Sequence, residues 1–217
     1  MSRTLWGFAA IAPNTNGIAL PELLIVRVSV GLARDGSGAS FGERFMHRKI
    51  TIAAVLTAIA IIIPMFMPIK IIIPPASYTL GSHVPIFVAC FISPLTAFVV
   101  CVGATLGFLF AGFPLVIVAR AASQLIFALV MAFYIKKARN IKISNMIVLS
   151  VVISIIHALG EALVVQWLLF PTAANAEWVI WVLVGFGTFV HSMIDFWIAW
   201  GVLKGLRYAG VGIKRKS

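Results

Sequence analysis

The feature that most constrains this chain is an apolar run of helix length that begins behind basic residues. Residues 49–66 read Lys-Ile-Thr-Ile-Ala-Ala-Val-Leu-Thr-Ala-Ile-Ala-Ile-Ile-Ile-Pro-Met-Phe, and Lys49 is their only charge. A helix needs about 20 mostly apolar residues to span a bilayer. The run therefore predicts a membrane helix. Ala54 and Ala58, one turn apart, predict a small-residue face on which another helix can pack closely.

The rest of the chain has the same character, which excludes a soluble globular domain. It is 62% hydrophobic and 11% charged, with a mean hydropathy of +1.09. This composition predicts a polytopic membrane protein. The net charge of +11 does not indicate nucleic-acid binding, because nearly all 17 Lys and Arg residues lie outside the apolar runs. Cys90 and Cys101 lie within such runs, and the sequence has no disulfide framework or metal-ligand spacing.

Proline, glycine and basic residues divide the apolar sequence into six segments, which predict an all-α integral membrane protein with six transmembrane helices. The second segment is short: roughly 12 residues rise only ~18 Å of a ~30 Å hydrocarbon core. We expect it either to borrow length from its flanks or to lie deep among its neighbours. The segments are approximately 49–66, 82–93, 95–111, 114–135, 145–170 and 177–203.

The distribution of Lys and Arg predicts the orientation of the helices. Basic residues precede the first segment, fill 136–142 and recur from Lys204 to Lys216. The other three connections contain Lys70 as their only charge. Because cytoplasmic loops are enriched in Lys and Arg, six crossings would place both termini in the cytoplasm of a cell-membrane protein.

The first 45 residues differ from the rest, since they mix Gly, Ser and Arg with short apolar stretches. Two interpretations are open for this N-terminal extension. It forms an amphipathic helix on the membrane surface, or Met46 is the natural start and residues 1–45 are disordered or not natively translated. Residues 46–205 are the predicted membrane domain, and 206–217 a basic cytoplasmic tail.

Few polar residues lie inside the predicted helices, and each costs free energy there. Arg120, Gln124 and Glu161 fall ~9–15 Å from the outer ends of their helices, and so can share one level. Two interpretations of Arg120 are open. Its guanidinium clamps a substrate carboxylate, or it forms a structural ion pair with Glu161.

His157 and His191 fall at a second, deeper level, ~20 Å from the outer ends. Histidines between helices either bond to one another as packing contacts or bind a ligand, and the sequence leaves both open. Asp195 is four residues after His191 and hence on the same helical face, where it can orient that imidazole.

The segment 71–83 is too apolar for a free loop and too interrupted for a helix. It predicts a re-entrant, Pro-rich cap over a cavity, since irregular backbone is tolerated at membrane depth only there. Tyr78, Thr79 and His83 would supply a ring and hydrogen-bonding groups to the substrate. Trp167 lies near the same outer level, where tryptophans also form an interfacial belt.

No catalytic constellation is present: the sequence contains no nucleophile motif, zinc-protease motif or phosphate-binding lysine loop. We therefore predict that the chain is not an enzyme and carries no cofactor or metal. Without a nucleotide motif, the chain has no energy source of its own for active uptake. A stand-alone small transporter or channel is the alternative function class.

Several features together resemble the substrate-specific (S) components of energy-coupling factor (ECF) vitamin transporters. They are the six short helices, Ala54-x-x-x-Ala58 behind Arg48-Lys49, and Ser77-Tyr78-Thr79-Leu80-Gly81-Ser82-His83-Val84-Pro85 leading to Phe91-Ile92-Ser93-Pro94. The similarity covers roughly residues 46–205. It implies that Ala54 and Ala58 dock on a transmembrane coupling subunit driven by two cytoplasmic ATPases. It also implies vitamin capture in an outer cavity and toppling of the subunit to release the vitamin inside.

Among such components, the chain is most similar to the niacin type, with the pantothenate type second. Both vitamins are acids, so Arg120 does not separate them, and the sequence does not identify the vitamin. The expected substrate-binding residues are Tyr78, Thr79, His83, Arg120, Gln124, Glu161 and Trp167.

Overall fold

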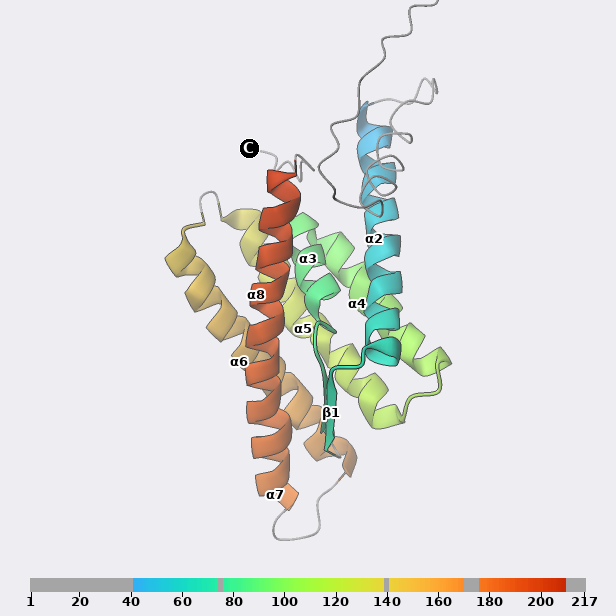
Figure 1. The fold of residues 1–217 in the computed structure, drawn as a ribbon, viewed down its shortest axis with the longest axis vertical. Coiled ribbons are helices and arrows are strands. Elements are labelled where there is room, and N and C mark those ends of the chain that lie inside the picture. Colours follow the sequence, from blue (N-terminus) through green and yellow to red (C-terminus); the bar gives the residue numbers. More distant parts are fainter. Residues whose placement is uncertain (1–40, 74–75, 139–140, 170–175, 210–217) are drawn as a thin grey trace, which may run out of the picture. The chain divides into compact units, whose positions relative to one another are not determined.

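The computed structural model describes residues 41–73, 76–138, 141–169 and 176–209, which are almost entirely helical (Figure 1). Five helices precede the last helical stretch, which is divided into α7 (Ala176–Val179), the π-helical turn η1 (Ile180–Phe186) and α8 (Gly187–Tyr208). The others are α2 (Phe41–Phe66), α3 (Val84–Ile92), α4 (Pro94–Phe110), α5 (Leu115–Lys137) and α6 (Ile143–Leu169).

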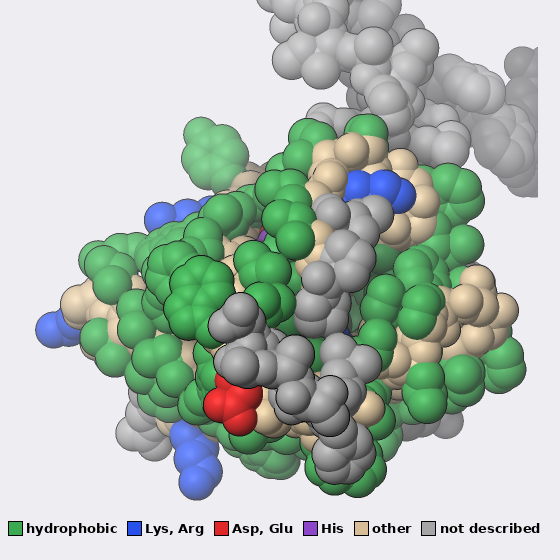
Figure 2. Space-filling model, turned by 90° about the horizontal axis from the view of Figure 1, so that it is seen from below, with side chains coloured by type: hydrophobic (Ala, Val, Ile, Leu, Met, Phe, Trp, Pro, Cys, Tyr) green, Lys and Arg blue, Asp and Glu red, His purple; other side chains and the backbone are tan. Residues whose placement is uncertain are grey.

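The described helices have the composition of membrane spans. Four are long and apolar enough to cross a bilayer: His47–Phe66, Leu115–Lys137, Ile143–Leu168 and Glu177–Tyr208. The surface is correspondingly apolar (Figure 2), with large side chains such as Phe110 at 84% and Leu95 at 71% exposure. The buried residues include Arg120, Glu161 and Asp195. This inversion of the usual soluble pattern fits a multi-pass membrane protein.

The six apolar segments expected from the sequence coincide with α2 to α6 and the α7–η1–α8 stretch. α3 has only nine residues, and those from Pro85 to Phe91 are buried, which agrees with the second of the two alternatives for this segment, a position deep among its neighbours. α4 follows after a single residue. Ser93 has an extended backbone, accepts a hydrogen bond from Thr96 N at 3.0 Å, and is followed by Pro94, so it ends α3 and caps α4.

α2 packs closely on α4 through glycines. A Cβ added to Gly103 would overlap the side chain of Thr57, and one added to Gly107 would overlap Ile61. The two glycines are one turn apart, which lets the α2 side chains approach the α4 backbone. Ala54 and Ala58 are exposed on another face of α2. α2 therefore has a packed inner face and an outer face that no other described residue covers at Ala54 and Ala58.

A two-stranded hairpin connects α2 and α3. β1 (Lys70–Ile73) pairs antiparallel with β2 (Ala76–Thr79), from Lys70 opposite Thr79 to Ile73 opposite Ala76. We expected irregular backbone in this segment, and the prediction was wrong in that respect. The β-branched run Ile71–Ile73 favours a strand, and the backbone groups of β1 are satisfied by pairing with β2 instead.

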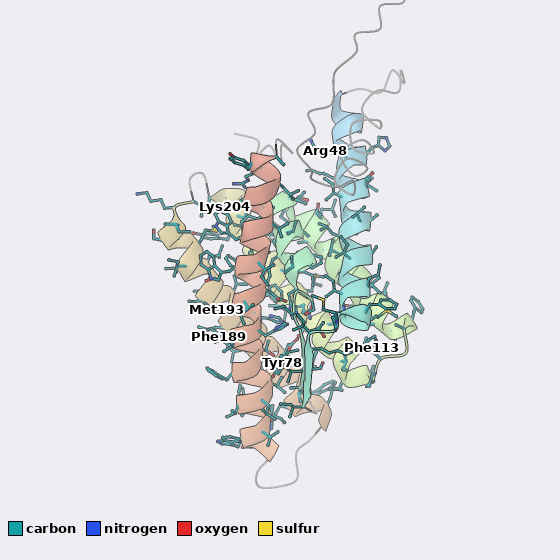
Figure 3. The ribbon with its side chains drawn as sticks, viewed as in Figure 1. Arg48, Tyr78, Phe113, Phe189, Met193 and Lys204 are labelled. Carbon is teal, nitrogen blue, oxygen red and sulfur yellow. The ribbon has the colours of Figure 1, made fainter. Side chains whose placement is uncertain are left out.

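The basic residues at the ends of α2 and α8 lie at the same end of this helical unit, as Figure 3 shows for Arg48 and Lys204. α5, whose last turn carries Lys136 and Lys137, ends at that end too (Figure 1). α2 begins at Phe41, five residues before Met46. The predictions for residues 1–40 and for the tail after 209 lie outside the described residues.

Candidate functional site

A cavity of about 160 Å³ lies beside the hairpin, between α2, α4, α5, α6 and α8. Its apolar walls come from Ile86, Phe108, Phe113 and Ile117. Figure 3 shows Tyr78 and Phe113 in the same region of the unit. The polar and charged side chains that line it are Lys70, Ser77, Thr79, Ser82, His83, Arg120, Gln124, Glu161 and His191.

Nine polar side chains meet at this cavity or directly behind it, and we call them the polar cluster. Their spacing follows helical periodicity: pairs one turn apart on α5 and on α6, and positions i, i+3 and i+7 on α8. Each helix thus turns one polar stripe toward the others. The members are Ser82, His83, Arg120, Gln124, His157, Glu161, Thr188, His191 and Asp195.

An ion pair between α5 and α6 forms one half of the polar cluster. Arg120 Nη2 lies 2.7 Å and Nε 3.2 Å from the same oxygen of Glu161, Oε2. Thr188 Oγ1 donates to that oxygen at 2.8 Å. Arg120 is 5% and Glu161 3% exposed, so two opposite charges share a site largely removed from solvent. The structure thus contains the ion pair between Arg120 and Glu161, and Arg120 also lines the cavity.

The other oxygen of Glu161 faces His157. Oε1 lies 3.3 Å from His157 Nε2, within the range of an ion pair if the imidazole is protonated. Among the described residues, neither ring nitrogen of His157 has a partner in acceptable hydrogen-bond geometry, although the residue is only 2% exposed. A buried polar side chain without a partner is costly and uncommon in native proteins.

His83 occupies the centre of the other half. Its Nδ1 lies 3.2 Å from Asp195 Oδ2, and its Nε2 lies 3.0 Å from Gln124 Nε2. A neutral ring that donates from Nδ1 to the carboxylate and accepts from the amide at Nε2 satisfies both contacts. The ring centroid lies 4.6 Å from that of His157 and 4.9 Å from that of His191, so His83 stands between the two histidines.

Asp195 ties the end of the hairpin to α8. Its two oxygens accept from Gly81 N at 2.8 Å and from His83 N at 2.9 Å. Gly81 has a φ of 81°, a conformation that favours glycine, and this turns the chain so that both N–H groups face the carboxylate. His191 Nε2 is 3.5 Å from Asp195 Oδ2. Asp195 thus accepts hydrogen bonds from the backbone that begins α3, and its contact with His191 is longer than those bonds.

Tyr78 anchors the hairpin to the π-helical turn. Its hydroxyl donates to the carbonyl oxygen of Leu183, which lies within η1. Gly187 permits this approach, because a Cβ there would overlap the Tyr78 hydroxyl. Burial raises the pKa of the Tyr78 phenol, so that it stays protonated as a donor. Wide π-turns are frequent at functional sites.

Of the predicted substrate-binding residues, five line the cavity: Thr79, His83, Arg120, Gln124 and Glu161. Tyr78 lies beside it. Trp167 is 70% exposed on α6 and is not among the lining residues. Sequence reasoning missed Ser82 and Thr188, whose hydroxyls bond within the polar cluster. Nothing in their sequence context separates them from Thr105, which bonds to the backbone of its own helix.

Two overlapping groups place their donor atoms within 4.8 Å of one another, the spacing of metal ligands: His83, His157 and Glu161, and His83, His191 and Asp195. The hydrogen bonds described above already account for Asp195, for both nitrogens of His83 and for Glu161 Oε2. We assign no metal to either group. The cluster supplies a cation, hydrogen-bond donors and flat rings beside a small cavity, which suits a small polar molecule with a carboxylate.

One curated relative has an informative similarity to the chain. The niacin transporter NiaX of Lactococcus lactis subsp. cremoris (strain MG1363) is 40% identical over 164 residues, which cover 71% of this chain and 72% of that protein. No protein-family model matches the chain. No solved structure matches it either.

Proposed function

The chain belongs to the family of the niacin transporter NiaX, and from this premise we propose that it is the membrane-embedded vitamin-binding subunit, the S component, of an ECF-type importer. Niacin is the proposed substrate. The observation that carries the proposal is the buried Arg120, which lines a small cavity in a member of this family. A transporter family also agrees with the prediction that the chain is not an enzyme.

The size and walls of the cavity support a single-ring vitamin. Typical ligand pockets have volumes of ~300–1,000 Å³, whereas this cavity has about 160 Å³. A pyridine carboxylate needs less room than the longer pantothenate. Phe108 and Phe113 offer apolar surface to the ring, and Arg120 offers the carboxylate a charge-assisted hydrogen bond.

We propose that the chain crosses the membrane six times with both termini in the cytoplasm. α4 has 17 residues and rises ~26 Å, close to the ~30 Å core, whereas the nine residues of α3 rise only ~14 Å. The hairpin and its turn would make up the missing length of α3 as a re-entrant cap on the outer side. The shared end of Arg48, Lys136 and Lys204 supports a cytoplasmic assignment for that end.

Energy for uptake would come from partners. The outer face of α2, with Ala54 and Ala58 exposed, is the proposed docking surface for a transmembrane coupling subunit driven by two ATPases. The described residues contain no charged side chain between Lys49 and Lys70, so a second apolar helix can pack there without burying a charge.

The most direct test identifies the small molecule that co-purifies with the chain by mass spectrometry. We expect niacin. Titration of the vitamin-free protein with nicotinate, nicotinamide and pantothenate then ranks the candidates, with nicotinate tightest. Tighter binding of pantothenate would replace niacin as the substrate, and absence of binding by any vitamin would refute the proposal. Uptake that persists in cells lacking the coupling subunit would indicate a stand-alone transporter instead.

A further inference from the structure

Arg120 can bind a carboxylate, but the net charge of the buried side chains around it is unfavourable for an anion. Among the described buried side chains, Arg120 is the cation, and Glu161 and Asp195 are the anions. With neutral histidines, this gives the cavity region one net negative charge. Lys70, at the rim, is exposed and solvent-screened. A bound carboxylate would bring a second buried negative charge, which is costly unless something compensates it.

His157 is the group placed to compensate. Both of its ring nitrogens lack a hydrogen-bond partner in the part of the chain that the structure describes, it is 2% exposed, and its Nε2 lies 3.3 Å from Glu161 Oε1. A neutral imidazole gains little from this arrangement. A protonated one donates from Nε2 to a carboxylate already in place, and the charge-assisted contact is stronger than a neutral one.

Of the three histidines in the polar cluster, His157 is the best placed to accept a proton, because the other two already use ring nitrogens in hydrogen bonds. His83 already uses both nitrogens, on Asp195 and Gln124, and His191 Nε2 lies 3.2 Å from the Ser82 hydroxyl. The groups that face His157 are the ring of His83 before α3, the ring of Phe127 on α5, and Glu161 on its own helix. Arg120 on α5 acts on it through Glu161, and Asp195 and His191 on α8 act through His83.

We propose that the site binds the vitamin carboxylate together with one proton, which His157 takes up. Arg120 turns from Glu161 toward the incoming carboxylate, and Glu161 then pairs with the imidazolium of His157. The proton comes from the solution, and no bond of the vitamin changes. His157 does not line the cavity, so it is a positioning residue that acts through Glu161. This inference rests on the proposed function, since it needs an anionic substrate.

Isothermal titration calorimetry on the purified full chain tests the proposal. Nicotinate is titrated at one pH in phosphate and in Tris, whose ionisation enthalpies differ widely, and the difference in heat gives the number of protons taken up. We expect about one proton for the wild-type chain and close to none for His157→Gln. The matched control, His47→Gln, changes an exposed histidine on α2 and should leave the proton count unchanged.

The pH dependence of affinity is a second measurement. Because one proton binds with the vitamin, the affinity for nicotinate should fall as the pH rises, by up to about tenfold per pH unit. His157→Gln should flatten this profile. Nicotinamide, which carries no carboxylate, should bind without proton uptake.

Three outcomes would overturn the inference. Nicotinate binding by the wild-type chain with no proton uptake would do so while leaving the proposed function intact. Undiminished proton uptake by the His157→Gln variant would show that another group takes up the proton. Proton uptake with nicotinate but none with bound benzoate, which lacks the ring nitrogen, would show that the vitamin itself takes up the proton. This second comparison uses the wild-type chain alone. Failure of nicotinate to bind at all would refute the proposed function itself.

Discussion

The polar cluster and the outer face of α2 differ in how far their side chains depend on one another. In the polar cluster, Arg120, Glu161 and Asp195 are buried and each charge has a partner, so removing one group leaves another unpaired in a low dielectric. On the outer face, Ala54 and Ala58 are exposed, small and uncharged, and nothing in the described residues depends on them. Substitutions should therefore affect folding and binding in the first region and only partner contacts in the second.

The largest effect is expected for Arg120→Ala. It leaves Glu161 buried without its cation, so we expect a loss of about 3–5 kcal/mol of stability. Nicotinate affinity should fall by about 1.5–3 kcal/mol through loss of a hydrogen bond to a charged group. Thermal unfolding in detergent and calorimetric titration measure the two losses.

A double variant, Arg120→Ala with Glu161→Gln, separates the loss of stability from the loss of nicotinate affinity. It removes the unpaired charge and should recover much of the stability while binding stays weak. Recovery of both would mean that Arg120 serves only the ion pair.

A smaller effect is expected on the inner face of α2. Gly103→Ala forces a Cβ into the side chain of Thr57 and should cost about 1–3 kcal/mol of stability by overpacking. The control is Gly201→Ala on α8, where a Cβ meets nothing within 4 Å and should stabilise the helix by about 0.5–1 kcal/mol. Equal shifts in melting temperature for the two variants would contradict the close α2–α4 packing.

Tyr78→Phe should reduce the stability of the chain by less than Gly103→Ala does. It removes one hydrogen bond, from the phenol to the Leu183 carbonyl, worth about 0.5–1.5 kcal/mol. Because that bond ties the hairpin to η1, nicotinate should also dissociate faster, which stopped-flow measurements can follow. Tyr208→Phe, at a side chain that is 98% exposed, should change neither quantity.

On the outer face, Ala58→Trp should leave the stability and nicotinate affinity of the isolated chain within ~0.5 kcal/mol of wild type. Uptake by cells that contain the coupling subunit should nevertheless be lost, because the indole fills the space a second helix would occupy. Normal uptake would show that this face is not the docking surface. Reduced affinity would show that the two regions are not independent.

The helices could be predicted from the sequence because lipid imposes a simple rule on apolar length and on the placement of Lys and Arg. Residue depth along each helix also brought Arg120 and Glu161 to one level, where they pair. His83 could not be placed in this way, since it follows a connection whose path depends on contacts with α8. It was expected in the cap, and it lies buried between His157 and His191.

The strand pairing of the hairpin and the π-turn were also beyond the sequence pattern. Ile71 to Ile73 suit a strand or a buried turn equally well, and only the pairing with β2 decides between them. The widened turn at Ile180–Phe186 has no compositional signal. In the structure, the Tyr78 hydroxyl donates a hydrogen bond to a backbone carbonyl of this turn, that of Leu183.

The bonds from Gly81 N and His83 N to Asp195 span 114 and 112 residues of sequence, and this sets an order of events during synthesis. α2 to α6 are synthesised before Asp195, so until Asp195 is made the N–H groups that begin α3 lack its carboxylate as an acceptor. The binding site can close only when the last helix has been inserted. A nascent chain arrested before α8 would already contain Arg120, but the hairpin and the start of α3 beside the cavity would not yet be held by Asp195.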